Sequence, residues 1–124
     1  MKKLTLIFII SALISVSCKK NETGGSATVT ITATHHGKKI PFTNIHIKYG
    51  AKEFPGHDVS SYNASQTSDI DAKASFENLR YGDYYFYGVG YDTAIQAPVR
   101  GGIGLSITWK ERKNKVDIEL PITE

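Results

Sequence analysis

The sequence predicts an all-β domain, a sandwich of about seven short strands. Apolar and polar residues alternate with a period of two from Ala27 onward, as they do along half-buried strands. Residues that favour turns, mainly glycine, proline, aspartate and asparagine, separate the alternating runs. No window of eleven residues has a convincing helical period. Many short strands divided by turns over residues 27–124 are typical of a β-sandwich.

The first half of the domain is expected to hold three strands. In the first, Val29, Ile31 and Ala33 alternate with threonines, which indicates a strand with one buried face. Pro41 cannot donate to a strand ladder, so it marks a sheet edge or the start of a strand. The expected elements, in chain order, are a strand at 27–34, a turn at 37–39, a strand at 44–49, a loop at 50–58 and a weak polar strand at 59–67.

The second half contains the strongest strand signal. Tyr84 and Phe86 are expected to point inward, Gly82 to allow a tight corner before them, and Gly88 and Gly90 to leave room for a neighbour. The expected elements, in chain order, are a turn at 68–73, a short strand that begins at 74–76, a corner at 79–83, a strand at 84–91, a strand or pair of strands at 95–99 and 103–109, a charged hairpin turn at 110–115 and a last strand at 116–120.

Residues 1–18 differ in composition from the rest of the chain. Lys2 and Lys3 precede an apolar stretch at 4–16, which as a helix is shorter than the ~30 Å bilayer core. Cys18, the only cysteine, follows directly, and this arrangement resembles a bacterial lipoprotein signal. The resemblance implies a signal peptide at 1–17, a lipid on Cys18 with a flexible tether at 18–26, and an outer-membrane location. Whether the domain occupies the periplasmic or the surface face stays open.

Three motifs of the domain resemble carboxypeptidase regulatory-like domains. They are GKKIPFTNIHI at 37–47, SDIDAKASF at 68–76 and LRYGDYYF at 79–86, followed by a closing VDIEL at 116–120. Ala72 stands where that family usually has glycine. The resemblance implies a transthyretin-like, or prealbumin-like, Greek-key sandwich over most of residues 27–121.

Composition and motifs exclude several functions. Without Lys2 and Lys3 the chain carries 13 basic and 12 acidic residues, too little net charge to bind nucleic acid through bulk electrostatics. There is neither a Gly-x-Ser-x-Gly elbow nor a phosphate-binding loop. Asp69 and Asp71 are spaced like two calcium ligands, but such acids in a turn more often form local hydrogen bonds. We therefore expect a protein without a cofactor and without catalytic activity.

Four histidines are the remaining candidates for chemistry. His35 and His36 are adjacent and are expected to point to opposite faces of a strand, so that they cannot bind one metal ion together. His46 requires a third ligand such as His57 or Asp58. The sequence therefore predicts no metal site. A pair of histidines clustered with an acid in the folded protein favours the alternative of an enzyme.

The candidate binding residues are aromatic. Three tyrosines of the strongest strand are expected to face outward, opposite to the core phase, and the only tryptophan is a candidate to join them. These residues are Tyr85, Tyr87, Tyr91 and Trp109. Three interpretations stay open: a neighbouring segment covers the rings, the rings contact a protein partner, or they stack on sugars.

The leading hypothesis is a lipid-anchored accessory or adhesion-type module that binds a protein, such as another protein of the outer membrane. The alternative is a lipoprotein that binds a surface glycan through its outward aromatic residues. A small hydrolase or a metal-binding protein is a lesser alternative. Separately, Asp92-Thr93-Ala94 resembles an O-glycosylation acceptor, which makes Thr93 a candidate modification site.

Overall fold

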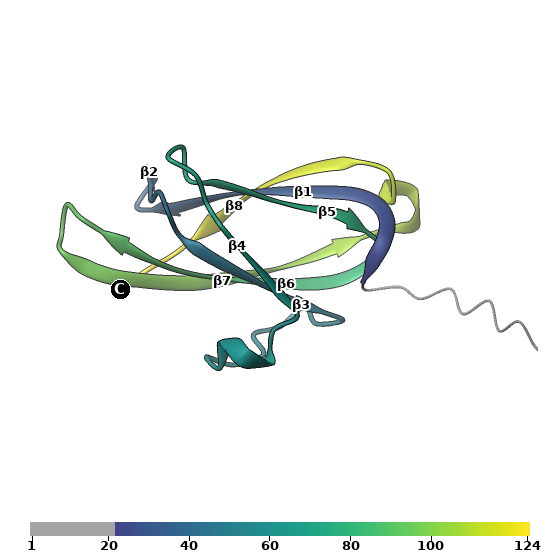
Figure 1. Ribbon diagram of the computed structural model, residues 1–124, viewed down its shortest axis with the longest axis horizontal. Coiled ribbons are helices and arrows are strands. Elements are labelled where there is room, and N and C mark those ends of the chain that lie inside the picture. Colours follow the sequence, from purple (N-terminus) through teal and green to yellow (C-terminus); the bar gives the residue numbers. More distant parts are fainter. Residues whose placement is uncertain (1–21) are drawn as a thin grey trace, which may run out of the picture.

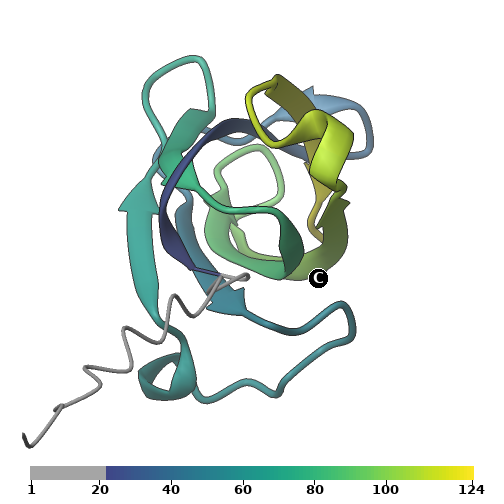
Figure 2. The same cartoon turned by 90° about the vertical axis from the view of Figure 1, so that its right-hand side faces the viewer.

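The computed structural model describes residues 22–124, which form two sheets packed face to face (Figure 1, Figure 2). The predicted all-β sandwich is confirmed. The first sheet contains β1 (Thr23–His35), β2 (Lys38–Lys39), β5 (Lys73–Leu79) and β8 (Lys115–Pro121). The second sheet contains β3 (Asn44–Tyr49), β4 (Ala64–Thr67), β6 (Gly82–Asp92) and β7 (Ala97–Ile107). Two 3₁₀ helices lie in the connections, η1 (Val59–Ser61) and η2 (Trp109–Glu111).

Strand β1 is the centre of the first sheet. Its Thr30 pairs with Ser75 of β5 across one edge and with Asp117 of β8 across the other. The short β2 pairs with the end of β1 on the same edge as β5. β5 and β2 are antiparallel to β1, whereas β8 runs parallel to it. The first and last strands of the described domain therefore lie side by side and point the same way.

The second sheet is antiparallel throughout, in the order β4-β3-β6-β7. Strands β6 and β7 form its longest hairpin, paired without interruption from Gly82 with Ile107 to Asp92 with Ala97. Residues 93–96 form the turn between them. The hairpin extends beyond β3 at the left of Figure 1, the end of the molecule opposite to the start of β1.

The core lies between the two sheets and follows the predicted phase. Tyr84 and Phe86 are fully buried, and the Phe86 ring lies 5.4 Å from that of Phe76 in the opposite sheet. The prediction that Gly88 and Gly90 leave room for a neighbour is confirmed. A Cβ on Gly88 would lie 2.7 Å from a Leu120 methyl carbon, and one on Gly90 would lie 2.7 Å from Oγ1 of Thr43.

The corner before β6 is fixed by a tyrosine. Gly82 has φ 139°, a conformation that favours glycine, and it turns the chain into β6. Two residues later the Tyr84 hydroxyl donates a hydrogen bond of 2.6 Å back to the Arg80 carbonyl. The same hydroxyl lies 3.3 Å from the carbonyl of Glu22, the residue before β1. A tyrosine at such a corner ties the turn to the core, as in many Greek-key sandwiches.

The C-terminal third differs from the expected elements in two places. The strand or pair of strands expected at 95–99 and 103–109 is a single strand, β7, which continues through Gly101 and Gly102, and Trp109 lies in η2 rather than in this strand. Residues 110–115 are not a hairpin turn. They include the end of η2 and carry the chain across to the other sheet, where β8 pairs with β1 rather than with β7.

Other boundaries also differ from those predicted. β1 begins at Thr23, four residues before the expected domain start, and both Thr23 and Ala27 lie opposite Leu79 because the strand bulges between them. A Cβ on Gly25 would lie 2.2 Å from the Leu79 carbonyl oxygen, so this close approach requires glycine. The expected strand at 59–67 is η1 followed by the short β4.

The turn at 68–73 is held by local hydrogen bonds to an aspartate, as expected from the sequence. The Asp69 carboxylate accepts hydrogen bonds from the backbone N–H groups of Asp71, at 2.8 Å, and Lys73, at 3.0 Å. The expected local role is confirmed. Ala72 has φ 63°, in the left-handed region where glycine is better tolerated, and its side chain is fully buried.

Over residues 22–124 no helix has the length and apolar character needed to cross a membrane.

We expect Tyr84→Phe to lower the free energy of unfolding by about 1–2 kcal/mol, because the variant loses the hydroxyl that fixes the corner. Urea denaturation monitored by circular dichroism measures this change. Tyr91→Phe removes the hydroxyl of an exposed tyrosine on the same strand and is the matched control, with an expected change below about 0.5 kcal/mol. Equal effects of the two variants would contradict a role of the corner.

Candidate functional site

Three tyrosines of β6, Tyr85, Tyr87 and Tyr91, lie on its outer face as predicted, but the fold covers the first two. Tyr85 is 8% exposed and Tyr87 is 3% exposed, because the loop between β3 and β4 folds over this face of the sheet. Of the three interpretations of the aromatic row, the one in which a neighbouring segment covers the rings therefore holds for Tyr85 and Tyr87. We call the covered cluster the aromatic cap. It consists of Phe54, His57, Tyr62, Tyr85 and Tyr87.

Ring contacts and hydrogen bonds hold the aromatic cap together. Tyr62 stacks on Tyr87 with ring centroids 5.8 Å apart, and Phe54 lies within 6 Å of both Tyr85 and Tyr87. The Tyr62 hydroxyl donates to the Gly56 carbonyl at 2.9 Å, and Nδ1 of His57 lies 3.2 Å from the Tyr87 hydroxyl. These contacts connect the loop to the sheet at several points.

Two glycines of β7 allow the loop between β3 and β4 to pack closely against the outer face of the sheet. A Cβ on Gly102 would lie 2.4 Å from the Tyr85 hydroxyl oxygen, and one on Gly104 would lie 2.1 Å from the Lys52 carbonyl oxygen. The Tyr85 ring and the loop backbone therefore rest directly on the strand. Burial raises the pKa of Tyr85 and also raises the pKa of Tyr62, to about 12, with the nearby phenols of Tyr85 and Tyr87 adding to the second shift.

The other two candidate aromatics are exposed and lie far apart. Tyr91 is 52% exposed and Trp109 is 58% exposed. Tyr91 pairs with Pro98 near the tip of the β6–β7 hairpin, whereas Trp109 follows β7 at the end where Ile107 pairs with Gly82. Nine residues of strand separate these two ends, which corresponds to roughly 30 Å. Tyr85, Tyr87, Tyr91 and Trp109 therefore do not form one continuous binding surface.

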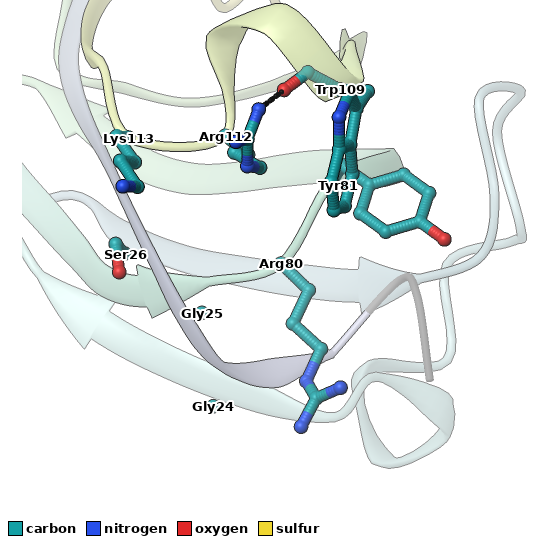
Figure 3. Close-up of a pocket in the computed structure, with 8 residues that line it drawn as sticks. All are labelled: Gly24, Gly25, Ser26, Arg80, Tyr81, Trp109, Arg112 and Lys113. Atoms are coloured by element: carbon teal, nitrogen blue, oxygen red, sulfur yellow. Dashed lines mark hydrogen bonds between the residues drawn. The ribbon is translucent and has the colours of Figure 1, made fainter. Parts of the chain in front are cut away.

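Trp109 lines a groove at the end of the domain where β1 begins (Figure 3). Its ring meets the Tyr81 ring edge-on at 5.0 Å, and the Arg112 guanidinium lies 4.1 Å from its centroid. Arg112 also donates a hydrogen bond of 2.7 Å to the Trp109 carbonyl. We call this cavity of about 260 Å³ the Trp109 groove. It is lined by Gly24, Gly25, Ser26, Arg80, Tyr81, Trp109, Arg112 and Lys113.

The short helix that carries Trp109 is closed by a capping box. The Thr108 hydroxyl donates to the Glu111 carboxylate at 2.6 Å, and this carboxylate also accepts from the Thr108 backbone N–H at 3.3 Å. These hydrogen bonds lower the pKa of Glu111. Trp109 is thus exposed but held in a defined position, and the groove around it carries an excess of positive charge.

The remaining candidate site residues are Thr93, Tyr91 and Cys18. Thr93 is exposed in the turn of the β6–β7 hairpin, as a modification site requires. Tyr91 lines a hollow of about 470 Å³ beside Phe42 and Lys38. Cys18 lies outside the described residues.

Sequence reasoning missed a polar cluster at the hairpin end. His35 is only 2% exposed, and its Nδ1 lies 2.8 Å from the Asp92 carboxylate. Lys38 donates to the other oxygen of Asp92 at 2.8 Å. These two hydrogen bonds, first that of His35 and then that of Lys38, hold the pKa of Asp92 well below its usual range. A histidine and an aspartate 57 residues apart give no local signal of such a contact.

The geometry expected for the adjacent histidines is also wrong. His36 follows the last residue of β1 and has φ 50°, so strand alternation no longer applies to it. The His35 and His36 rings lie 4.2 Å apart, and Glu124 is close to both. His46 and His57 are elsewhere, beside Tyr62 and within the aromatic cap. The structure thus brings together two histidines and an acid, whereas the expected strand geometry had placed His35 and His36 on opposite faces.

Comparison with protein-family models gives no match to this chain, and a search of curated proteins gives none either.

The raised tyrosine pKa values predict how stability depends on alkaline pH. A phenol that ionises near pH 12 in the folded protein and near pH 10 in the unfolded chain favours the folded state below pH 10. The contribution is lost as pH rises from about 10 to 12. We expect the free energy of unfolding to fall more gradually over this range in Tyr62→Phe than in the parent protein. Urea denaturation at several pH values measures the free energy of unfolding of both proteins. The same pH dependence in the parent protein and in Tyr62→Phe would contradict burial of Tyr62.

Proposed function

We propose that this protein is a non-catalytic, lipid-anchored module of the outer membrane that binds a partner protein through the Trp109 groove. The observation that carries the proposal is that Trp109 is exposed and yet fixed between Tyr81 and Arg112. A few residues dominate the binding energy of most protein interfaces, and tryptophan, tyrosine and arginine are enriched among them. A side chain that is ordered before binding loses less conformational entropy when the complex forms.

The charge of the groove indicates the chemistry of the partner. Arg80, Arg112 and Lys113 line it, and Lys110 is exposed on the same short helix. The neighbouring Glu111 is engaged by Thr108. A segment of a partner that carries acidic residues beside an apolar side chain complements this surface.

The lipid attachment in this proposal places the groove near the membrane. The attachment rests on the lipoprotein-like sequence of residues 1–18. Only four residues lie between Cys18 and Thr23, the start of β1, so the connection spans at most about 18 Å. The groove is lined by Gly24, Gly25 and Ser26 of the same strand. A partner that reaches it is therefore itself close to the bilayer, which favours an outer-membrane protein.

The proposal also includes the transthyretin-like, carboxypeptidase regulatory-like assignment of the domain. Two features support it. The tyrosine corner at Tyr84 occupies the LRYGDYYF motif, and the Asp69 turn with left-handed Ala72 occupies the SDIDAKASF motif. In both, the residues on which the resemblance depends have a local structural role.

A surface glycan is the second candidate ligand, and the geometry favours it less. Sugar rings stack on an open aromatic face. The Arg112 guanidinium lies over the Trp109 ring, while the tyrosines that would extend the platform, Tyr85 and Tyr87, are covered. The groove therefore suits a protein better than a sugar.

We expect Trp109→Ala to reduce capture of the partner at least tenfold, because it removes the central aromatic contact. The full-length protein is crosslinked in native cell envelopes and purified, and the crosslinked proteins are quantified by mass spectrometry. Tyr91→Ala removes a similarly exposed aromatic residue at the opposite end and is the matched control.

A partner captured equally by the parent and Trp109→Ala proteins, or lost equally with Tyr91→Ala, would refute the groove as the binding surface. Absence of any reproducible protein partner, with lipid confirmed on Cys18, would refute the protein-binding proposal. Binding of the protein to a glycan array that is lost in Trp109→Ala would then support the second candidate.

We expect Cys18→Ala to abolish incorporation of labelled palmitate and to move the protein from the detergent phase to the aqueous phase in phase partition. Both measurements use cells that express the full chain. Ser17→Ala changes the neighbouring position to another small residue and is the control. Unchanged partition of Cys18→Ala would contradict the lipid anchor.

A further inference from the structure

One nitrogen of the His35 ring, Nδ1, makes a hydrogen bond, and the other, Nε2, makes none within the described residues. Nδ1 lies 2.8 Å from the Asp92 carboxylate, which is ionised and accepts only, so Nδ1 carries the proton and donates. In neutral imidazole this leaves the lone pair on Nε2. Nε2 is buried and has no hydrogen-bond partner in the described part of the chain. A buried acceptor without a partner is costly, and it calls for an explanation.

Two further ligand groups lie in front of this nitrogen. The Glu124 carboxylate is 3.6 Å from Nε2 of His35, and the ligand atoms of His35, His36 and Glu124 all lie within 4.8 Å of one another. The positive φ of His36 turns its ring alongside that of His35. His36 is exposed and the Glu124 side chain is 63% exposed, so both have room to move closer.

We propose that His35, His36 and Glu124 bind a divalent transition-metal ion of the zinc class. Two imidazoles and one carboxylate form a ligand set typical of zinc, whereas calcium and magnesium prefer oxygen ligands. Ligands at about 2.0–2.1 Å from a tetrahedral zinc ion lie roughly 3.3 Å apart. The separation of 3.6 Å between His35 and Glu124 is already close to this value. A water molecule completes the fourth position.

Asp92 is the positioning residue of this site. A ligating histidine commonly donates its second N–H to a carboxylate, which fixes the tautomer and the ring orientation. Asp92 has this role for His35, and Lys38 neutralises part of its charge. The structure thus contains the outer hydrogen bond of the site as well as its three ligands.

A simple ion pair between His35 and Glu124 explains the arrangement less well. At 3.6 Å the two atoms are too far apart for a hydrogen bond, and Nε2 keeps no partner. Bound metal, in contrast, satisfies Nε2 and links the turn between β1 and β2 to the segment that follows β8.

Isothermal titration of the full chain in detergent with Zn²⁺ tests the proposal. We expect one saturable site per chain with a micromolar or lower Kd. His36→Asn keeps a residue that tolerates positive φ, and Glu124→Gln removes only the charge; each is expected to weaken binding at least tenfold. His46→Gln and Glu119→Gln are the controls, since neither residue belongs to the cluster.

Visible absorption of the Co²⁺-loaded protein gives a second readout. We expect the intense d–d bands of four-coordinate Co²⁺, shifted in Asp92→Asn but not in Lys38→Met, which removes the other partner of Asp92. Absence of a stoichiometric Zn²⁺ site would overturn the proposal. Equal weakening by His36→Asn and His46→Gln would also overturn it, because it would indicate adventitious binding to surface histidines.

Discussion

The parallel pairing of β1 with β8 is the constraint on which the rest of the molecule depends. It joins Thr28–Thr34 to Lys115–Pro121, two segments separated by almost the whole domain. The pairing brings Leu120 and Ile122 over Gly88 and between the sheets, where both side chains are fully buried. A parallel pair needs a long connection, and here that connection includes the six strands β2 to β7 together with η1 and η2.

Both candidate sites lie at the ends of this pair. The Trp109 groove forms where η2, just before β8, meets the first residues of β1. The cluster of His35, His36 and Glu124 forms where β1 ends and the chain emerges from β8. Neither site is formed by residues that are close together in the sequence, because each combines residues from the beginning and the end of the domain. The β1–β8 register therefore sets the geometry of both.

The predictable part of the structure was the part governed by local rules. The period of two identified the inward phase of Tyr84 and Phe86, and Gly82 marked a corner that the chain does turn at positive φ. The wrong predictions concern strand pairing between segments that are far apart in the sequence. The charged segment at 110–115 has the local composition of a hairpin turn, and only the pairing of Val116 with Val29 shows that the chain crosses to the other sheet.

The candidate site illustrates the same limit. Strand alternation placed Tyr85 and Tyr87 on the outer face correctly, but nothing local to the loop at 50–58 shows that it returns over them. His36 was assigned to the wrong side because a positive φ at a non-glycine residue has only a weak sequence signal. Trp109 could be named as a candidate, whereas its contacts with Tyr81 and Arg112 required the folded chain.

The direction of β1 and β8 also has a mechanical consequence. Because the strands run parallel, a pull on the start of β1 against the end of β8 acts along the strands and loads their interstrand hydrogen bonds in shear. Bonds in shear must break together, whereas bonds in an antiparallel hairpin pulled from its open end separate one after another. A domain held at its first strand and loaded beyond its last strand would therefore resist extension as a unit.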